Sequence, residues 1–365
     1  MGDGNGRVAG PRCIALVGPF ASGKTTLLEA ILARTGAVTR QGTIAEKNTL
    51  GDASPEARAH QMSVEANVAE TEFMGDHFTF IDCPGSVEFA FEAEGVLAGV
   101  DLAVVVAEAD AKKVPALQVM LKMLEDRRIP RLLFLNKMDK AEAGGRETLD
   151  LLKPASGVPM VLRHIPITEK GVTTGFVDLA LERAFVYREH APSELVDMTD
   201  ETRSAEADAR YAMLEKLADY DDGLMEQLLE DIEPERDKIF SDLVAEMRAG
   251  QICPVFIGAA EHGNGVGRLL KAIRHEAPSI ADTRKRLGIA GGGDAILQVM
   301  KTLHTTHGGK LSIARVLTGS VGDGAELTGP DGPVGRAAGI FRIMGQQAAK
   351  RDAAHETRIR EFLNA

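Results

Sequence analysis

Short apolar runs alternate with segments of helical apolar spacing through the first part of the chain. Residues 13–17, 102–106 and 132–135 are uniformly apolar, which is typical of strands buried on both faces of a sheet. Residues 26–34 and 114–128 repeat apolar side chains every three to four positions, as amphipathic helices do. This alternation predicts an α/β fold with a mostly parallel sheet and helices on both faces.

The regular pattern breaks near Lys153 and resumes at the apolar strand 253–258, which is followed by a helical segment at 266–275. About a hundred residues, 153–250, therefore form an α+β insertion between two strands of one sheet. Within the insertion the pattern predicts a strand at 158–167, a turn region at 168–175, and helices at 203–220 and 235–249.

The last part of the chain has a different pattern. Short strands such as 295–300, 311–317 and 334–343 lie between turns that contain glycine, which predicts a small β-barrel. The charged stretch 346–365 shows no strand pattern. The expected plan is a flexible start at 1–11, a main domain at 12–287, a glycine-rich linker at 288–293, a partial barrel at 294–345 and a charged tail at 346–365.

Composition narrows the functional classes. The chain has 365 residues and a net charge of −12, which argues against loose, sequence-independent binding to DNA. Cys13, Cys83 and Cys253 form no C-x-x-C pair, so we expect free thiols in a reducing compartment. Neither a signal peptide nor an apolar run of membrane-spanning length is visible, so a cytoplasmic location without a membrane partner is expected.

The eight residues Gly18-Pro19-Phe20-Ala21-Ser22-Gly23-Lys24-Thr25 match the phosphate-binding pattern G-x-x-x-x-G-K-[ST]. An apolar strand precedes them and a helical segment, beginning with Thr26, follows. Chance would produce such a match about once in a hundred chains of this length. Backbone N–H groups of this P-loop can surround a di- or triphosphate, with Lys24 over the β- and γ-phosphates and the Thr25 hydroxyl on Mg²⁺.

A second motif, Asp82-Cys83-Pro84-Gly85, ends the predicted strand 77–82. P-loop enzymes place a carboxylate at this point that holds Mg²⁺ through water, and a glycine N–H that meets the γ-phosphate. By itself the tetrapeptide is more often a simple strand-to-turn Pro-Gly, so it gains weight only from the P-loop before it.

The third motif reads a base. Asn136-Lys137-Met138-Asp139 follows the apolar strand 132–135. Asp139 can accept hydrogen bonds from the N1–H and the 2-amino group of guanine, Asn136 can serve the other edge, and the Lys137 stem can cover the ring. Adenine offers neither donor and would leave the carboxylate unpaired, so this arrangement selects guanine.

Gly258-Ala259-Ala260 ends the last predicted sheet strand, where the Ala260 N–H could bond guanine O6, although a plain strand-to-loop turn explains this tripeptide more simply. The expected nucleotide-binding residues are Gly18, Pro19, Phe20, Ala21, Ser22, Gly23, Lys24, Thr25, Thr26, Asp82, Asn136, Lys137, Asp139, Ala259 and Ala260.

The order of these four motifs, with the insertion between the last two, resembles a translational GTPase, most closely elongation factor G. Residues 223–230 (GLMEQLLE) and 253–259 (CPVFIGA) are similar to the insert region of that factor, and residues 307–316 (HGGKLSIARV) resemble the start of its β-barrel domain. The resemblance covers roughly residues 13–345 and implies a P-loop fold, GTP or GDP with Mg²⁺, and the ribosome as partner. Release-factor-type GTPases and ribosomal protection proteins share most of this pattern.

Three departures from that family bear on activity. The family places histidine after D-x-P-G to position the attacking water, whereas this chain has Ser86. In the first switch the family has a threonine that binds Mg²⁺, and the equivalent stretch here, about 59–64, offers Ser63 and contains His60. The family continues through three further domains, so a shortened chain or a fragment is expected. The resemblance implies Lys24, Asp82, Gly85 and Ser86 as catalytic residues and Thr25, Asp82 and Ser63 as metal ligands.

Two functions follow from these residues. The first is a Mg²⁺-dependent GTPase of the elongation factor G type. The alternative is a GTP-binding module that docks on the ribosome or another partner with little turnover, because Ser86 replaces the histidine and the translocation domains are missing. An ATP-using P-loop kinase is disfavoured by Asn136, Lys137 and Asp139.

Overall fold

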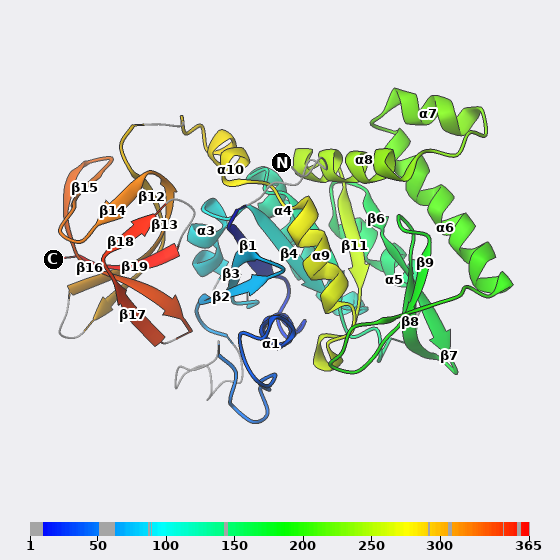
Figure 1. Ribbon diagram of the computed structural model, residues 1–365, viewed down its shortest axis with the longest axis horizontal. Coiled ribbons are helices and arrows are strands. Elements are labelled where there is room, and N and C mark those ends of the chain that lie inside the picture. Colours follow the sequence, from blue (N-terminus) through cyan, green and yellow to red (C-terminus); the bar gives the residue numbers. More distant parts are fainter. Residues whose placement is uncertain are drawn as a thin grey trace.

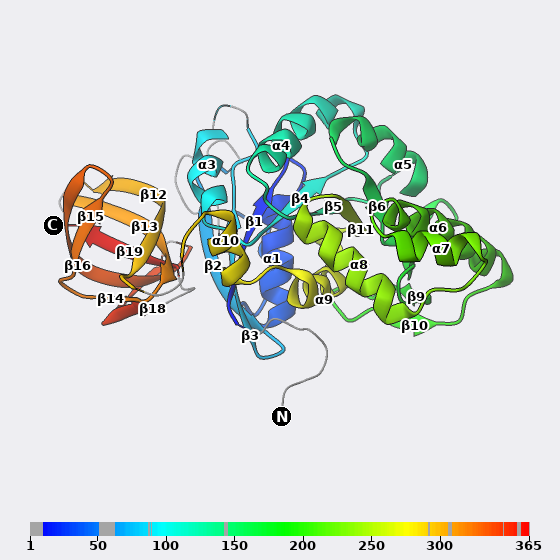
Figure 2. The same cartoon turned by 90° about the horizontal axis from the view of Figure 1, so that it is seen from above.

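Three parts of the molecule lie side by side: a β-barrel, a central α/β domain and an insertion (Figure 1). The computed structural model describes residues 10–50, 63–86, 88, 90–141, 145–290, 293–305, 309–345, 347–355 and 359–364. The expected flexible start therefore lies almost wholly outside the described residues. The barrel and the insertion occupy opposite ends, with the central domain between them (Figures 1 and 2).

The central domain is built on a sheet that has seven strands in the described part of the chain, in the order β2-β3-β1-β4-β5-β11-β6. All neighbours are parallel except the β2–β3 hairpin, which is antiparallel. The mostly parallel sheet predicted from the apolar runs is confirmed. The strands are β1 (Arg12–Val17), β2 (Asn67–Phe73), β3 (Asp76–Asp82), β4 (Leu102–Ala107), β5 (Arg131–Leu135), β6 (Met160–Leu162) and β11 (Cys253–Ile257).

Helices cover both faces of this sheet because side chains alternate along its strands. Ile14 and Leu16 of β1 join one buried cluster, which includes α1 and α9, whereas Cys13, Ala15 and Val17 join a second cluster with α3 and α4. Figure 2 shows the two layers of helices on either side of the strands. The helices are α1 (Lys24–Thr35), α3 (Ala90–Ala98), α4 (Val114–Asp126), α5 (Gly145–Leu152), α9 (Val266–Glu276) and α10 (Ile280–Arg286).

The insertion lies between β5 and β11, which are neighbours in the sheet as expected. It contains a four-stranded antiparallel sheet and three helices among the described residues. Its elements are β7 (His164–Glu169), β8 (Val172–Asp178), β9 (Arg183–Val186), β10 (Glu194–Val196), α6 (Asp200–Ala218), α7 (Asp222–Leu229) and α8 (Arg236–Ala249).

Two expectations for the insertion were wrong. The single strand predicted at 158–167 is two strands, because β6 pairs with β11 of the central sheet and β7 pairs with β8 of the insertion. The turn region predicted at 168–175 is mostly strand, because it contains the end of β7 and the start of β8. The turn itself is confined to Lys170 and Gly171, which have φ values of 51° and 81°. Cross-strand pairing decided both outcomes, and such pairing is not visible in a local pattern.

The expected charged tail without strands at 346–365 was also wrong. Its described residues form β17 (Gln347–Arg351), β18 (Ala353–His355) and β19 (Ile359–Asn364), and β19 lies between β13 and β16. A barrel that stops at residue 345 would lack this inner strand. Hydrogen bonds to two strands far away in the sequence hold a polar segment extended, which overrides its weak local preference.

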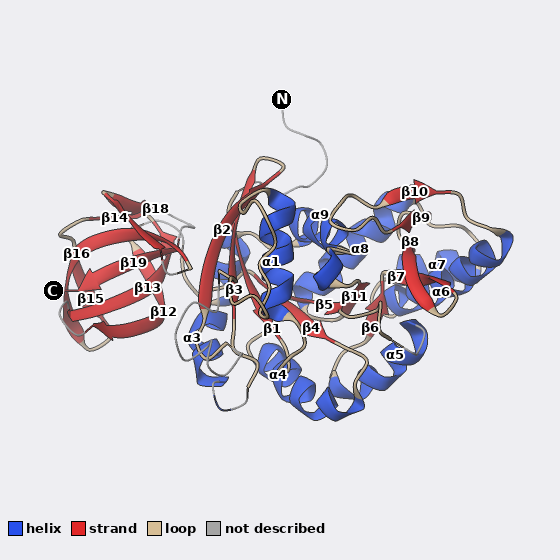
Figure 3. Cartoon of the chain, turned by 90° about the horizontal axis from the view of Figure 1, so that it is seen from below, coloured by secondary structure: helices blue, strands red, loops and turns tan. Residues whose placement is uncertain are grey.

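The remaining barrel strands are β12 (Ile296–Thr305), β13 (Gly309–Thr318), β14 (Ser320–Gly322), β15 (Glu326–Gly329) and β16 (Gly332–Met344). Figure 3 shows the barrel built from strands beside the mixed central domain. A small apolar cluster fills its interior, with Val316, Ala337 and Ile340 among its buried members.

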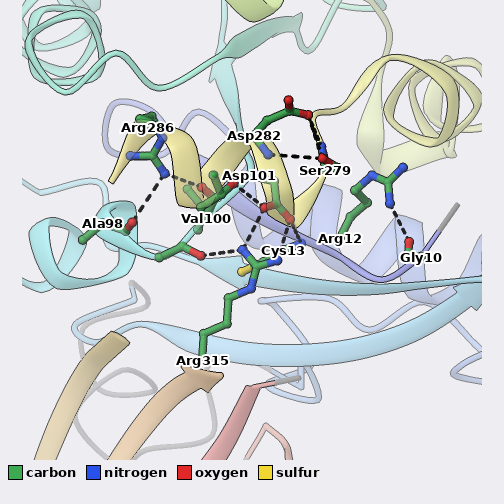
Figure 4. A network of polar contacts seen from close by, with 12 residues as sticks. Gly10, Arg12, Cys13, Ala98, Val100, Asp101, Ser279, Asp282, Arg286 and Arg315 are labelled. Carbon is green, nitrogen blue, oxygen red and sulfur yellow. Dashed lines mark hydrogen bonds and ion pairs between the residues drawn. The ribbon is translucent and has the colours of Figure 1, made fainter. Parts of the chain in front are cut away.

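A buried ion pair joins the barrel to the central domain (Figure 4). Arg315 of β13 donates from Nη2 to Asp101 Oδ2 at 2.8 Å and from Nη1 to Oδ1 at 2.9 Å, and both side chains are fully buried. Asp101 also accepts from the Cys13 backbone N–H at 2.8 Å and from the Thr283 hydroxyl at 2.5 Å. One carboxylate therefore connects the barrel, the central sheet and α10.

A second contact places strand β12 directly on helix α3, which follows the D-x-P-G motif. A Cβ atom on Gly95 would lie 2.4 Å from the Met300 carbonyl oxygen, so only glycine permits this approach. Beside it, Lys301 Nζ lies 3.2 Å from Glu92 of α3 and 2.7 Å from Glu65. The barrel thus contacts segments on both sides of the second motif.

Replacing Arg315 with methionine should destabilise the protein by about 3–5 kcal/mol, because Asp101 would remain buried without its counter-charge. Arg336→Met provides a matched control, since Arg336 pairs with Glu326 on the surface and such pairs contribute at most about 1 kcal/mol. Urea-induced unfolding measures both. Equal effects of the two substitutions would contradict the assignment of Asp101–Arg315 as the junction.

Candidate functional site

The four motif loops come together at the carboxyl ends of parallel strands. β1, β3, β5 and β11 each end in one motif, and the order of these strands in the sheet brings the loops to one edge. Ligands of open α/β sheets bind at this edge. Two adjoining clefts are found there, of about 720 Å³ and about 240 Å³, and both are lined by Gly23, Thr26, Ile44 and Lys137.

The backbone of the P-loop has the shape that a phosphate cradle requires. Gly18 has a φ of 144°, and a Cβ atom there would lie 2.2 Å from the Val106 carbonyl oxygen. Gly23 has a φ of 95° and precedes the first residue of α1. Lys24 is buried, and its Nζ donates to the carbonyl oxygens of Gly18 at 3.1 Å and Pro19 at 3.0 Å. The lysine is thus held inside the loop in which the phosphates are expected.

The expected metal ligands also meet. Thr25 Oγ1 donates to Asp82 Oδ2 at 2.6 Å and lies 3.1 Å from Ser63 Oγ. Two hydroxyls and a carboxylate are hard oxygen donors, the kind that Mg²⁺ prefers, so these residues fit that ion. In the described ranges no group of three or more His, Cys, Asp or Glu side chains is placed to hold a metal ion. Magnesium at this position would therefore share its coordination with phosphate oxygens and water.

Gly85 brings the second motif against the P-loop. A Cβ atom on Gly85 would lie 2.2 Å from Lys24 Nζ and 2.8 Å from the Pro19 carbonyl oxygen, so this position must be glycine. Ser86 follows it and is half-buried. His60, the other residue considered for positioning water, lies outside the described residues.

Asn136, Lys137 and Asp139 of the N-K-x-D motif line the larger cleft. Asp139 lines this cleft, and its side chain is 16% exposed. Lys137, with a φ of 61°, extends across the P-loop to donate to the Ala21 carbonyl oxygen at 2.7 Å, and its ammonium group also lies 2.7 Å from Glu108 Oε2. Lys137 lines both clefts.

Asn136 and Ala260 differ from expectation. Asn136 is buried, its Nδ2 donates to the Ser22 carbonyl oxygen at 2.9 Å, and its Oδ1 accepts from the Ala260 N–H at 2.9 Å. The amide that was expected at one edge of guanine and the N–H that was expected at guanine O6 thus bond to each other. A buried amide needs both a donor and an acceptor partner, and the P-loop after β1 and the loop after β11 supply them.

Several residues at the cleft were missed from the sequence. The loop after α1 supplies residues 39–45 of the cleft wall, and Gln41 Nε2 donates to the Ala260 carbonyl oxygen at 3.1 Å. His262, two residues after the G-A-A motif, has Nε2 at 3.5 Å from Asp139 Oδ2. The position of His262 beside a base-reading motif was a usable signal, whereas nothing local marks Gln41.

Comparison with known proteins shows the family to which this chain belongs. Residues 11–279 match the protein family described as the elongation factor Tu GTP binding domain, which covers well over half of the chain. The chain belongs to this family. The expected resemblance to translational GTPases of the elongation factor G type is confirmed, and so is the P-loop fold class.

Similar proteins extend the match of this GTP-binding domain into the barrel. An elongation factor G-like protein of Synechocystis sp. is 43% identical over 338 residues, which are 92% of this chain and 50% of that protein. Elongation factor G 2 of Geobacter metallireducens is 26% identical, over 94% of this chain and 52% of that protein. A mitochondrial ribosome-releasing factor 2 of Culex quinquefasciatus is 28% identical, over 87% of this chain and 43% of that protein.

A crystal structure of a protein from Thermus thermophilus has a TM-score of 0.82 and 28% identity, over 96% of this chain and 52% of that one. The chain thus spans about half the length of the relatives that it matches.

Replacing Asn136 with alanine should separate the loops that it joins. The Ser22 carbonyl and the Ala260 N–H would each lose a buried partner, at a cost of about 1–3 kcal/mol for each group. Gln118→Ala is the control, because Gln118 is exposed on α4 and surface substitutions of this kind cost about 0.5 kcal/mol or less. Urea unfolding without nucleotide is the measurement, and equal losses in the two variants would refute the structural role of Asn136.

Proposed function

We propose that this protein binds and hydrolyses GTP with Mg²⁺ as a ribosome-dependent factor of the elongation factor G type. The observation that carries the proposal is that two adjoining clefts share lining residues. The smaller cleft is lined by Lys24, Thr25 and Ser63, and the larger by Asp139, with Lys137 in the wall of both. A nucleotide needs such an arrangement, with a phosphate site and a base site at opposite ends of one cavity.

The phosphate end supplies positive charge and hydrogen-bond donors. Lys24 is fixed over the loop by two carbonyl oxygens, so its charge is in place before a ligand arrives. The N-terminus of α1 adds the partial positive charge of its free N–H groups at the same point. Thr25, Asp82 and Ser63 would hold the magnesium ion, which neutralises charge on the phosphate oxygens when bound.

Hydrolysis depends on the placement of one water molecule, because phosphoryl transfer requires little covalent chemistry from the protein. Gly85 lies close to Lys24, and its backbone N–H would contact the terminal phosphate. Ser86 comes next, where the family resemblance implies a histidine. A serine hydroxyl is shorter than an imidazole by a few ångströms, and a misplacement of about 1 Å can reduce rates about a hundredfold.

The alternative function, a GTP-binding module with little turnover, also depends on Ser86. A protein with an intact cleft and Ser86 in place of histidine would bind GTP and dock on its partner with slow turnover. The two functions differ in hydrolysis rate alone, so kinetics rather than binding distinguishes them.

The proposed setting is the cytoplasm, with the ribosome as partner. The ribosome as partner rests on the family to which the chain belongs and on the names of the relatives, one of which is a ribosome-releasing factor. The cytoplasm rests on the free thiols of Cys13, Cys83 and Cys253, which are typical of a reducing compartment. The described part of the chain contains no helix with the length and apolar character needed to cross a bilayer.

Guanine nucleotides should stabilise the protein and adenine nucleotides should not. A ligand at about a hundred times its Kd adds about 2.7 kcal/mol to the free energy of unfolding. Each kcal/mol raises the Tm by roughly 2–4 °C in a domain of this size. The measurement is a thermal shift with GDP, GTP or ATP in the presence of Mg²⁺. An equal shift with ATP would refute the guanine site.

The Asp139→Asn variant should lose the response to GDP and gain a response to xanthosine diphosphate. The base of this nucleotide has a carbonyl oxygen, an acceptor, where guanine has its 2-amino donor.

Replacing Ser86 with histidine should raise ribosome-stimulated GTP hydrolysis by about 10²–10⁴-fold, the range typical of a positioned acid–base group. Ser86→Ala is the matched control and should leave the rate near that of the unmodified protein, because the hydroxyl is too short to orient the water. Single-turnover kinetics with and without ribosomes gives the rates. Turnover by the unmodified protein that Ser86→His fails to increase, although the variant still binds GTP and ribosomes, would contradict this role.

A further inference from the structure

A row of ionisable side chains runs from the Asp139 carboxylate to the insertion. Asp139 Oδ2 lies 3.5 Å from His262 Nε2, and His262 Nδ1 lies 3.2 Å from Glu189 Oε1. Both nitrogens of one imidazole thus face carboxylates. None of the sequence motifs contains His262 or Glu189, and neither residue takes part in the phosphate chemistry described above.

The backbone holds this row in place. His262 ends the short 3₁₀ helix η4 (Ala260–His262), which follows β11. Glu189 lies in the loop after β9, and the next residue, His190, donates its N–H to the His262 carbonyl oxygen at 3.0 Å. His190 has a φ of 51° and lines the larger cleft. The insertion therefore reaches the base end of the nucleotide site through a loop that is bonded to η4.

Asp139, His262 and Glu189 can form their contacts at the same time as Asp139 binds guanine. An ionised carboxylate has about four lone-pair positions. Asp139 can therefore accept two hydrogen bonds from guanine while its contact with His262 Nε2 remains. Only a protonated imidazole can donate to Asp139 and Glu189 at once. The neighbouring Glu261 of η4 has a cationic partner of its own, Lys140, at 2.7 Å.

We propose that His262 is a positioning residue for guanine recognition, which holds the Asp139 carboxylate in its reading orientation and is itself held by Glu189 of the insertion. The inference rests on the proposed guanine-nucleotide function. A carboxylate fixed before the base arrives loses less freedom on binding, which increases affinity. The increase in affinity is largest for a base that donates hydrogen bonds to both carboxylate oxygens.

The test compares GDP with inosine diphosphate, which lacks the 2-amino group but keeps N1–H. Equilibrium dissociation constants are measured by competition against a fluorescent GDP analogue for the unmodified chain, His262→Ala, His262→Lys and Glu189→Gln. His77→Ala is the matched control, because His77 also lies beside a carboxylate, Glu72 at 3.9 Å, but on the β2–β3 hairpin away from the base.

His262→Ala should weaken GDP binding by about two- to fivefold, the range that a partly exposed ion pair supports. Binding of inosine diphosphate should weaken less, so the preference for GDP should fall. His262→Lys, which keeps a cationic donor, should restore part of that preference, and Glu189→Gln should lower it in the direction of His262→Ala. His77→Ala should change neither constant.

The outcomes distinguish a failure of the positioning role of His262 from a failure of the proposed guanine-nucleotide binding. If the unmodified chain fails to bind GDP, the proposed function itself is wrong. If it binds GDP and His262→Ala leaves the ratio of the two dissociation constants unchanged, the inference is overturned, whether both constants stay constant or both rise equally. An equal rise would show that His262 only stabilises the loop.

Discussion

The structure of the site depends on the two hydrogen bonds of the Asn136 side chain. They connect the Ser22 carbonyl of the P-loop to the Ala260 N–H after β11, and Asn136 itself follows β5, so three loops become one unit. The same contact explains why Gly23 must be glycine, since a Cβ atom there would lie 2.3 Å from Asn136 Nδ2. With this amide in place, the phosphate end and the base end of the cavity keep a fixed separation.

A second constraint links the nucleotide site to the barrel. Helix α3 follows the motif that contains Asp82 and Gly85, and strand β12 packs on it where Gly95 leaves no room for a side chain. Lys301 contacts Glu92 on α3 and also Glu65, which lies two residues beyond Ser63, a proposed metal ligand. The barrel therefore rests on elements at both edges of the phosphate site, and the buried Asp101–Arg315 pair fixes its position.

The insertion acts on the opposite end of the cavity. Its loop at Glu189 and His190 bonds to η4 and borders the cleft beside Asp139. The barrel thus lies near the proposed phosphate site, and the insertion lies near the proposed base site. A ligand that bridges both ends would contact elements belonging to all three parts of the chain.

By itself the sequence determined the parallel sheet, the P-loop and the positions of Asp82, Lys137 and Asp139, because each depends on residues that are close together in the chain. Apolar runs predict buried strands, and a motif directly after a strand must lie at the sheet's carboxyl edge. Tertiary structure alone decided the partners of Asn136, the pairing of strand β19, and the contacts that join Asp139, His262 and Glu189. These contacts join residues far apart in the sequence, 124 positions for Asn136 and Ala260 and 73 for His262 and Glu189. The pairing of Asn136 follows from the hydrogen-bonding needs of a buried amide. All of these contacts become defined only once the sheet has brought the loops together.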